Sequence, residues 1–483
     1  MPTTNDHDSR SSTTELDEDV QYCSDEETPL LTKTSVYDRF TRRKKRVIVG
    51  LVSWCGLMPL FTTGSFFPTI PDIARDLNSS GAVISLAVSL SVLATSIGAL
   101  FAASYSSFYG RRPIYLLSLP LLVGGSIGVA FAQSIPALMV FRFLQAFGAS
   151  PGLSVGAGVI GDIYPLESRG GAMGVFFAAC LLGPALAPLC GGAIAQAVGW
   201  RVTQWVVAGA GAVGLGCMWL LFPETSHPSA RGLDAYRKET DSNAKLVWVN
   251  PLRPLALLKS PNLLAVTIAG LFVLLPQYVV MTALPFVVAE KYGITNQSFI
   301  GLCYLPVGLG NLVGAPLAGR LSDIFVRRSL HKNKTQKDWY PEARLQGTLI
   351  GAGCVVPLSV LGSGLVSQFG GSSAPWLALN AACLFLNGLG ADLVLSPSAA
   401  YGVDIMHSRS AESMAANNGL RSFLMAGLIA GVVPLVEHKG IAAATGLAAG
   451  FAWIGGFGLL WTTVMYGAKM RSSVKMEYST QED

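Results

Sequence analysis

Charged residues are scarce in this chain: only 13% of its 483 residues are Asp, Glu, Lys or Arg, whereas 51% are hydrophobic. A soluble domain carries about 25% charged residues, because its surface must face water. The shortage of charge therefore excludes an ordinary soluble domain and indicates a membrane protein.

Cysteine and histidine are also few, and neither is arranged for chemistry. None of the eight cysteines forms a CxxC pair, and seven lie in or beside apolar stretches, which is typical of packing residues. The five histidines show no metal-ligand spacing. Because no clustered nucleophile and base and no phosphate-cradling loop is visible, we expect no enzyme activity, no metal and no bound cofactor.

Long apolar runs dominate the rest of the sequence. A helix needs about 20 apolar residues to cross about 30 Å of hydrocarbon, and twelve stretches meet that length. We predict membrane spans over residues 47–70, 82–103, 113–132, 136–160, 171–197, 202–222, 264–288, 297–318, 345–367, 374–400, 412–434 and 440–466.

Basic residues predict the orientation. Counted on these spans, 28 of the 34 Lys and Arg residues fall on the side of the amino terminus, and such residues accumulate on the cytosolic side of membranes. The amino-terminal segment has no apolar run, so we predict that it is disordered. The predicted order is a cytosolic tail over 1–46, a six-helix bundle over 47–222, a cytosolic linker over 223–260, a second six-helix bundle over 261–466 and a cytosolic tail over 467–483.

A repeated motif supports two equivalent halves. "GRLSDIFVRR" (residues 319–328) follows the eighth span and "ASYSSFYGRR" (residues 103–112) follows the second, with Asp323 and Ser107 as counterparts. Duplicated six-helix halves are the layout of many secondary carriers, whose substrate site lies near mid-membrane between the halves. We therefore predict an all-α membrane protein with twelve transmembrane helices in two pseudo-symmetric six-helix bundles.

The motif also resembles a known signature. Its second copy looks like the loop signature of the major facilitator superfamily, and Gly110, Arg111 and Arg112 look like the latter part of that signature in the first half. "RFLQAFGASPG" (residues 142–152) is similar to the fourth-helix motif of the superfamily, and "GPALAPLCGG" (residues 183–192) is similar to its fifth-helix antiporter motif. The resemblance implies a carrier that exchanges its substrate for another solute.

Two further segments resemble the fungal twelve-span drug:proton antiporters of this superfamily: "DIYPLESRGGAMG" (residues 162–174) and "AANNGLRS" (residues 415–422). The resemblance extends over about residues 45–470. The loop after the fourth span reads "PLESR" and lacks the doubled proline of sugar porters, which argues against sugar uptake.

The second copy of the motif suggests a gate. Gly319 would let two helices approach closely, while Asp323 would pair with Arg327 or Arg328, or cap a nearby helix. A latch of this kind would be made in one state of the carrier and broken in the other. The alternative is that these arginines only enforce the topology.

The first copy lacks the aspartate, because Ser107 can form a hydrogen bond but carries no charge. Its latch should be weaker, unless Asp162 or Glu167 supplies the missing carboxylate; otherwise these are solvated loop charges. The partner would be one of three arginines at the same face: Arg111, Arg112 or Arg169.

Arg142 lies inside the fourth span, where a charge is costly unless it faces a wet cavity or a partner. Gln145, three residues further on, lies on the same helical face. We interpret the two residues as part of the substrate or proton pathway. The alternative is a structural arginine whose donors are satisfied by backbone carbonyls.

The second half offers its own pathway residues. Asp392, near Asn387 in the tenth span, would carry a proton if burial raises its pKa, or would be a structural partner for an arginine. Asn417, Asn418 and Arg421 lie one turn apart and would meet an anion arriving from the cytosol. Alternatively, Arg421 reaches to the membrane interface as an anchor.

The fifth span combines small residues with prolines. Gly183, Ala187 and Gly191 recur at four-residue spacing and predict a face for close helix packing. Pro184 and Pro188 remove backbone donors and should bend the helix. A bend beside a close interface would suit a rocking element.

Short motifs indicate the subcellular localisation of the protein. "EETPLL", with Glu26, Leu30 and Leu31, fits an acidic dileucine sorting signal in an exposed tail. Asn78 and Asn296 begin glycosylation sequons on the predicted outer face. We expect the plasma membrane, with the vacuolar membrane as the alternative.

The resemblance implies a proton-coupled antiporter and allows exporters of organic acids such as itaconate; together with the charges inside the spans, it predicts export of a small anionic metabolite. The excess of Arg142 and Arg421 over Asp392 gives the membrane interior a net positive charge, which favours an anion. A multidrug or secreted-glycolipid exporter is the alternative, followed by a non-transporting nutrient sensor. We expect the proton gradient to replace any cofactor. The expected partners are the substrate, protons and the lipid bilayer, with no nucleic acid, and the chain should be a monomer.

Overall fold

The computed structural model is helical, with no strand among the residues it describes. These residues are 39–164, 166–226, 231–240, 247–294, 296–332, 341–406 and 409–473. Twelve of the helical segments are long and apolar enough to cross a membrane. The predicted all-α fold with twelve spans is therefore confirmed.

The first half contains six spans in nine short or long elements. They are α1 (Arg42–Gly64), η2 (Phe67–Thr69), α2 (Ile70–Asp76), α3 (Gly81–Tyr109), α4 (Arg111–Phe131), α5 (Ile135–Ala149), α6 (Pro151–Ile163), α7 (Leu166–Val198) and α8 (Trp200–Leu221). The first span combines α1, η2 and α2, and the fourth combines α5 and α6. Between the halves lie α9 (Gly232–Thr240) and η3 (Arg253–Lys259).

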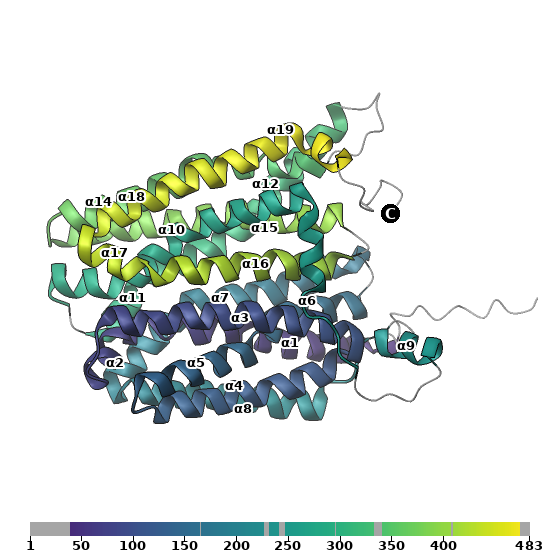
Figure 1. Cartoon of the computed structure of the whole chain (residues 1–483). Helices are drawn as coiled ribbons and strands as arrows, with labels where there is room; N and C mark the ends of the chain where they lie inside the picture. The colour runs from purple at the N-terminus through teal and green to yellow at the C-terminus, as the bar shows by residue number, and fades with distance from the viewer. Residues whose placement is uncertain are drawn as a thin grey trace, which may run out of the picture.

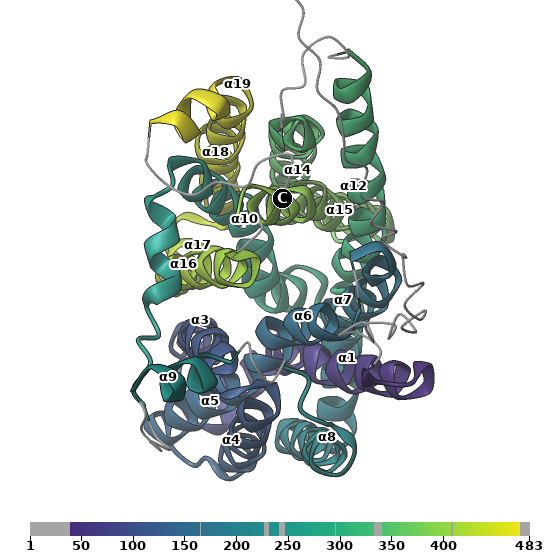
Figure 2. The same ribbon diagram turned by 90° about the vertical axis from the view of Figure 1, so that its right-hand side faces the viewer.

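The second half repeats this plan with more interruptions. Its elements are α10 (Pro261–Tyr292), α11 (Gln297–Cys303), α12 (Leu305–Lys332), η4 (Pro341–Leu345), α13 (Thr348–Ile350), η5 (Gly351–Val355), α14 (Val356–Phe369), α15 (Ala374–Ile405), α16 (Ser410–Ala430), α17 (Val432–Lys439), α18 (Ile441–Phe451), η7 (Ala452–Phe457) and α19 (Gly458–Ser472). Figures 1 and 2 show the first half, in purple and blue, lying against the second half, in green and yellow.

The two described ends of the chain lie at one end of the bundle, since an even number of spans separates them. We call this end the terminal face and the opposite end the distal face. At the distal face one apolar cluster joins both halves, and in it the rings of Phe67 and Tyr304 stack with their centroids 6.0 Å apart. Toward the terminal face each half has a separate apolar cluster. Among the described residues, the apolar cluster at the distal face therefore spans both halves, whereas the two clusters toward the terminal face each lie within one half.

Two pairs of helices form the seam between the halves. Along α3 and α16, Ser96 donates a hydrogen bond over 2.7 Å to the carbonyl of Gly419. Along α7 and α11, the backbone N–H of Gln297 donates to Oε1 of Gln196 over 2.9 Å. A Cβ added at Gly308 of α12 would lie 2.1 Å from the backbone of α7, so only glycine fits there.

The two copies of the repeated motif differ in backbone conformation. In the first copy α3 ends at Tyr109, Gly110 has a φ of +107°, and α4 begins at Arg111. In the second copy α12 continues through the motif to Lys332. The prediction of a loop there is wrong, because the second copy has no glycine at the matching position to take the left-handed conformation that ends α3.

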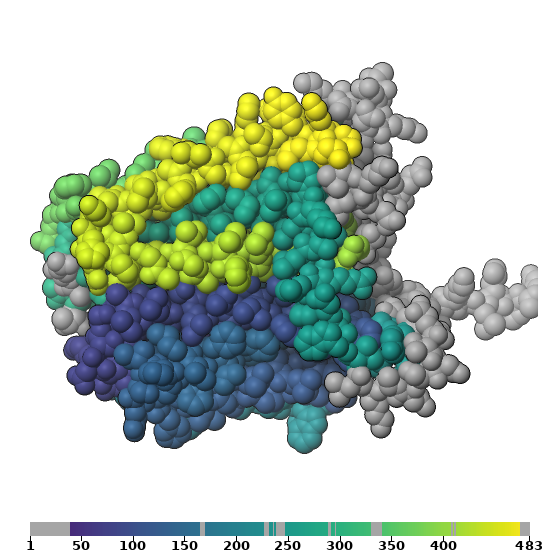
Figure 3. Space-filling model, in the orientation of Figure 1, coloured from purple at the N-terminus to yellow at the C-terminus, as the bar shows by residue number. Residues whose placement is uncertain are grey.

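The linker crosses the seam at the terminal face. The hydroxyl of Tyr109 accepts a hydrogen bond from the N–H of Val247 over 2.6 Å and donates one to its carbonyl over 2.7 Å. The ring of Trp248 packs edge-on against Tyr105. Beyond this point η3 lies against α16 of the second half. We call residues 247–259 the strap. In Figure 3 the strap forms part of the teal surface between the two halves.

Candidate functional site

Arg142 of α5 lies fully buried in the first half, with 0% of its surface exposed. Its Nη1 donates to the carbonyl of Thr62 over 3.3 Å and to Oε1 of Gln145 over 2.7 Å. The ring of Phe66 covers the guanidinium, 4.1 Å from its carbon atom. The first span and a neighbour on its own helix therefore fix the orientation of this arginine.

Gln145 connects Arg142 to two other spans. Its Nε2 donates to Oγ of Ser126 on α4 over 2.8 Å and to Oε1 of Gln204 on α8 over 2.9 Å. All four side chains are buried. The result is a polar network inside an otherwise apolar bundle, in which the amide orients the arginine.

One edge of the Arg142 guanidinium has no partner among the described residues. Its Nε and Nη2 are buried and form no hydrogen bond with the described part of the chain, and no carboxylate there forms an ion pair with it. These two nitrogens lie on the same side of the planar group and match the two oxygens of a carboxylate. An unpaired buried charge is costly, so this edge is suited to receive an anion.

In the second half, Asp392 of α15 carries a buried Oδ2 that has no hydrogen-bond partner in the described part of the chain. Arg421 of α16 is close enough to interact electrostatically with Asp392 and Tyr278, but no ion pair within 4 Å joins Arg421 to Asp392 among the described residues. A carboxyl in this position can change its charge without breaking a direct contact.

The predicted convergence on α16 is only partly present. Nη2 of Arg421 donates to Oδ1 of Asn418 over 2.7 Å. Oδ1 of Asn417 is buried and has no partner in the described chain, so this side chain does not join the pair. A Cβ added at Gly270 of α10 would lie 3.5 Å from the guanidinium of Arg421. Arg421 therefore packs against a neighbouring helix, which does not fit the role of an interfacial anchor.

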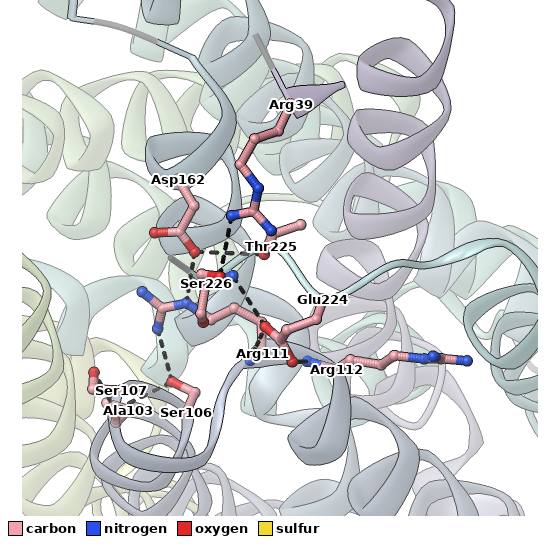
Figure 4. Close-up of polar contacts among 10 residues, drawn as sticks. All are labelled: Arg39, Ala103, Ser106, Ser107, Arg111, Arg112, Asp162, Glu224, Thr225 and Ser226. Carbon is pink, nitrogen blue, oxygen red and sulfur yellow. Dashed lines mark hydrogen bonds and ion pairs between the residues drawn. The ribbon is translucent and has the colours of Figure 1, made fainter. Parts of the chain in front are cut away.

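At the terminal face of the first half, an ion pair joins Arg111 to Asp162 (Figure 4). Nε of Arg111 lies 3.0 Å from Oδ2 of Asp162, and its Nη1 donates to Oγ of Ser106 over 2.9 Å. Ser107 instead donates to the carbonyl of Ala103 on its own helix. Of the two carboxylates that the sequence suggested for this corner, Asp162 takes the place that Ser107 cannot fill.

The other two side chains of that prediction, Glu167 and Arg169, lie outside the described side chains. Arg112 has a different partner from the one considered: its Nη2 donates to the carbonyl of Trp219 over 2.8 Å. It therefore ties the start of α4 to the end of α8.

Glu224, which follows α8, contributes to this corner and was missed by sequence reasoning. Its Oε1 accepts the N–H of Arg111 over 2.9 Å, and its Oε2 accepts the N–H of Arg112 over 3.2 Å. A Cβ on Gly110 would lie 2.5 Å from Oε2, so glycine is needed there for space as well as for its positive φ. The carboxylate thus caps the positive end of α4.

The Glu224 cap is also linked to Arg39, which precedes α1. Oε1 of Glu224 accepts the N–H of Ser226 over 3.0 Å, and the carbonyl of Ser226 accepts Nη1 of Arg39 over 3.3 Å. Thr225 donates to Oδ2 of Asp162 over 3.5 Å. The only available signal was an acid directly after the sixth span, and nothing local links it to Arg111.

The second half has a similar ion pair, but not the one predicted. Nε of Arg344, at the start of the ninth span, lies 2.7 Å from Oδ2 of Asp404, at the end of the tenth. Asp323 lies 3.8 Å from Nη1 of Arg344. The prediction that Asp323 pairs with Arg327 or Arg328 or caps a helix is wrong: among the described residues its ion pair is with Arg344, and it lies inside α12 and not at the start of a helix.

The predicted close approach at Gly319 is also wrong, since a Cβ added there would meet nothing within 4 Å. Close approaches occur elsewhere on the eighth span. A Cβ added at Gly314 of α12 would lie 2.8 Å from the carbonyl oxygen of Leu389. The helix therefore packs through glycines nearer the middle of the membrane.

The fifth span shows the close packing that its spacing predicted. A Cβ on Gly183 would lie 2.7 Å from Leu60, and one on Gly191 would lie 2.5 Å from the carbonyl of Ser65. The helix α7 continues through Pro184 and Pro188 without interruption. Its other face meets the second half, so α7 lies between the first and eighth spans.

The remaining predicted residues lie at the distal face or outside the description. Asn78 and Asn296 are exposed. Oδ1 of Asn296 accepts the N–H of Ser298 over 2.9 Å and caps α11. Glu26, Leu30 and Leu31 lie outside the described residues. Within the described ranges, no group of three or more His, Cys, Asp or Glu side chains could hold a metal ion.

Comparisons with known proteins agree with this architecture. A family model for the Major Facilitator Superfamily matches residues 52–434. Citrate exporter 1 of Aspergillus niger is 26% identical over 82% of this chain and 81% of its own. The efflux pump radE of Floropilus chiversii is 29% identical over 90% of this chain and 82% of its own. The crystal structure of the human organic anion transporter MFSD10 aligns with a TM-score of 0.57 at 17% identity, over 86% of this chain and 99% of that one.

Proposed function

Because the chain belongs to the major facilitator superfamily and is an integral multi-pass membrane transporter, we propose that it exports a small organic anion in exchange for protons. The observation that carries this proposal is the buried, unpartnered edge of Arg142. Nη1 is already held by Thr62 and Gln145. A carboxylate that reached Nε and Nη2 would satisfy the guanidinium without reorienting it, which lowers the cost of binding.

The relatives support an anionic substrate. One of them is named a citrate exporter, and a structural neighbour is named an organic anion transporter. The described membrane interior adds Arg421 to Arg142, with Asp392 as the nearby acid. This balance of charge favours a dicarboxylate of the itaconate type over a neutral solute.

We assign the terminal face to the cytosol, since most basic residues of the sequence fall on that side. The distal cluster then closes the outer end, and the separate clusters at the terminal face correspond to a state in which the halves can part toward the cytosol. Substrate would load in this state. Closure at the terminal face and release of the distal cluster would then deliver it outside.

Asp392 is the proposed proton carrier. Its Oδ2 has no hydrogen-bond partner, and Arg421 interacts with it electrostatically. The anion-loaded carrier would turn outward with Asp392 ionised. After the anion leaves, Asp392 would take up a proton outside and the carrier would return with it, so that anion and proton move in opposite directions.

A second candidate function is export of an apolar metabolite or drug. A groove of about 350 Å³ between α10, α11, α12 and α15 is lined mainly by apolar side chains, among them Phe299, Leu302 and Leu377. A relative named as an efflux pump has a similar degree of identity. This groove would admit a substrate from the lipid side without using Arg142.

Counterflow in proteoliposomes separates the two candidates. We expect labelled citrate or itaconate to exchange in the wild type. Arg142→Gln should reduce exchange about tenfold or more, because it removes the charge that would bind the carboxylate; a tenfold loss corresponds to about 1.4 kcal/mol of binding free energy. Arg142→Lys should recover part of it, since lysine keeps the charge but not the two-pronged edge. The matched control Arg75→Gln removes an exposed arginine at the distal face and should leave exchange unchanged. Exchange of an apolar dye that ignores Arg142 would favour the second candidate.

A further inference from the structure

The first turns of α1 carry five consecutive cations, which we call the basic cluster: Arg42, Arg43, Lys44, Lys45 and Arg46. All except Lys45 have exposed side chains. Over the part of the chain that the structure describes, no carboxylate forms an ion pair with any of them. Among the described residues, the cluster is therefore a concentration of charge without a counter-ion.

Because the basic cluster lies at the start of a helix, its charge is less stable unless an anion lies nearby. The amino end of a helix carries partial positive charge, so cations there are repelled unless an anion is near. The first turn of α1 contains no acidic residue, and its one side-chain cap is a hydrogen bond of 3.4 Å from the N–H of Lys44 to Thr41. Phosphate oxygens would satisfy both the free N–H groups and the side-chain cations.

The surroundings place the cluster where lipid headgroups lie. In Figure 2 the purple start of α1 projects sideways beyond the neighbouring helices at the terminal face. Directly after the cluster, Val47 is 47% exposed and Trp54 is 42% exposed, so the lipid-facing apolar surface begins within two turns. Lys45 lies 5.2 Å from the ring of Tyr164 and Lys44 lies 5.5 Å from the ring of Phe40. These ring contacts hold the cations without neutralising them.

We propose that the basic cluster binds the headgroups of anionic phospholipids in the leaflet at the terminal face. Anionic lipids are concentrated in the cytosolic leaflet, so the proposal rests on the orientation given under the proposed function. The same chain contains a rival anion, because residues 15–27 include seven Asp and Glu residues. The lateral, lipid-level position of the cluster favours the membrane over this tail.

The test measures lipid retention by the full chain in nanodiscs of phosphatidylcholine with or without phosphatidylserine, read by native mass spectrometry. We expect the wild type to retain phosphatidylserine, and Arg42→Gln/Arg43→Gln to retain about threefold less, as expected for charges at a membrane surface. The matched control Arg327→Gln/Arg328→Gln removes two exposed cations on the same face from the far part of α12. Equal loss in both variants would overturn the proposal. If the first variant fails to insert, Lys44→Gln/Lys45→Gln provides the same comparison.

Two further arms separate the sources of the anion. Soluble glycerophosphoserine should displace little phosphatidylserine; efficient displacement would indicate a site for free phosphate and overturn a lipid site. A chain lacking residues 1–38 should retain at least as much lipid, and loss of lipid with the tail would contradict the proposal. The readout needs no transport, and protease access to an amino-terminal tag tests the orientation separately. A failed transport proposal is thereby distinguished from a failed lipid site.

Discussion

Arg111 and Asp162 form an ion pair over 3.0 Å at the terminal face, joining the first residue of the third span to the end of the fourth. Arg344 and Asp404 form a similar pair over 2.7 Å between the ninth and tenth spans. Each pair lies within one half and does not cross the seam. These contacts therefore set the shape of each half at the face where, in our proposal, the halves part and close.

Asp162→Asn should weaken the first of these pairs. The Arg111 and Asp162 side chains are only 13% and 18% exposed, so loss of the charge should cost about 2 kcal/mol, less than for a fully buried pair. We expect a lower melting temperature and a shift in the balance of inward and outward states, measured by spin labels across the terminal face. The control Asp72→Asn breaks a pair at the distal face and should not shift this balance.

Ser107→Asp adds the charge that the first copy of the motif lacks. Because Asp162 already holds Arg111, and Ser107 faces its own helix, we expect this change to alter transport by less than twofold, within about 0.5 kcal/mol for an exposed charge. In the Asp162→Asn background the added carboxylate should partly restore the balance of states. Failure to restore it would show that the two positions are not interchangeable.

Glu224→Ala should destabilise the start of α4. Three backbone N–H groups lose their acceptor, two of them at the start of α4. At that helix start the loss costs about 1 kcal/mol for a cap plus about 0.5 kcal/mol for a charge at a helix terminus. Thermal unfolding in detergent should show a lower midpoint, with Glu224→Gln in between, since its amide oxygen can still accept one bond. Glu437→Ala, at an exposed site on α17, is the control and should leave the midpoint unchanged.

Tyr109→Phe should release the linker from α3. The phenol makes two hydrogen bonds to the backbone of Val247, and their loss should cost about 1–2 kcal/mol in local stability. Hydrogen exchange at the Val247 amide should therefore become about 5- to 30-fold faster. Tyr105→Phe keeps the ring that packs on Trp248 and should not change this rate. Equal protection in both variants would contradict a strap held by Tyr109.

The twelve spans were predictable because a helix that crosses a bilayer needs a long run of apolar residues, and such runs are visible in the sequence. At the terminal face, the sequence offered several candidate partners for the charged residues but did not determine which of them pair. Asp162 was among the candidates for Arg111, but Glu224 lies 113 residues away from Arg111 and no local pattern links them. The prediction that Asp323 pairs with Arg327 or Arg328 was wrong for the same reason. Helix packing brings Arg344 to Asp323, and sequence periodicity does not specify that packing.

Asp392→Asn tests the coupling to protons. Asparagine keeps the shape of the side chain but can neither take up nor release a proton, so accumulation driven by a pH gradient should be lost. Counterflow at equal pH needs no net proton movement and should continue, because Arg142 and its oriented edge are unchanged. The measurement compares both modes in the same proteoliposomes, with Asp72→Asn, which removes a carboxylate paired with Arg75 at the distal face, as the control. If the pH gradient still drives accumulation in Asp392→Asn, the proton is carried elsewhere. If counterflow is lost as well, Asp392 is instead a structural counter-charge for Arg421, and Arg421→Gln should then restore exchange in the double variant, since removing both charges leaves no unpaired ion in the membrane.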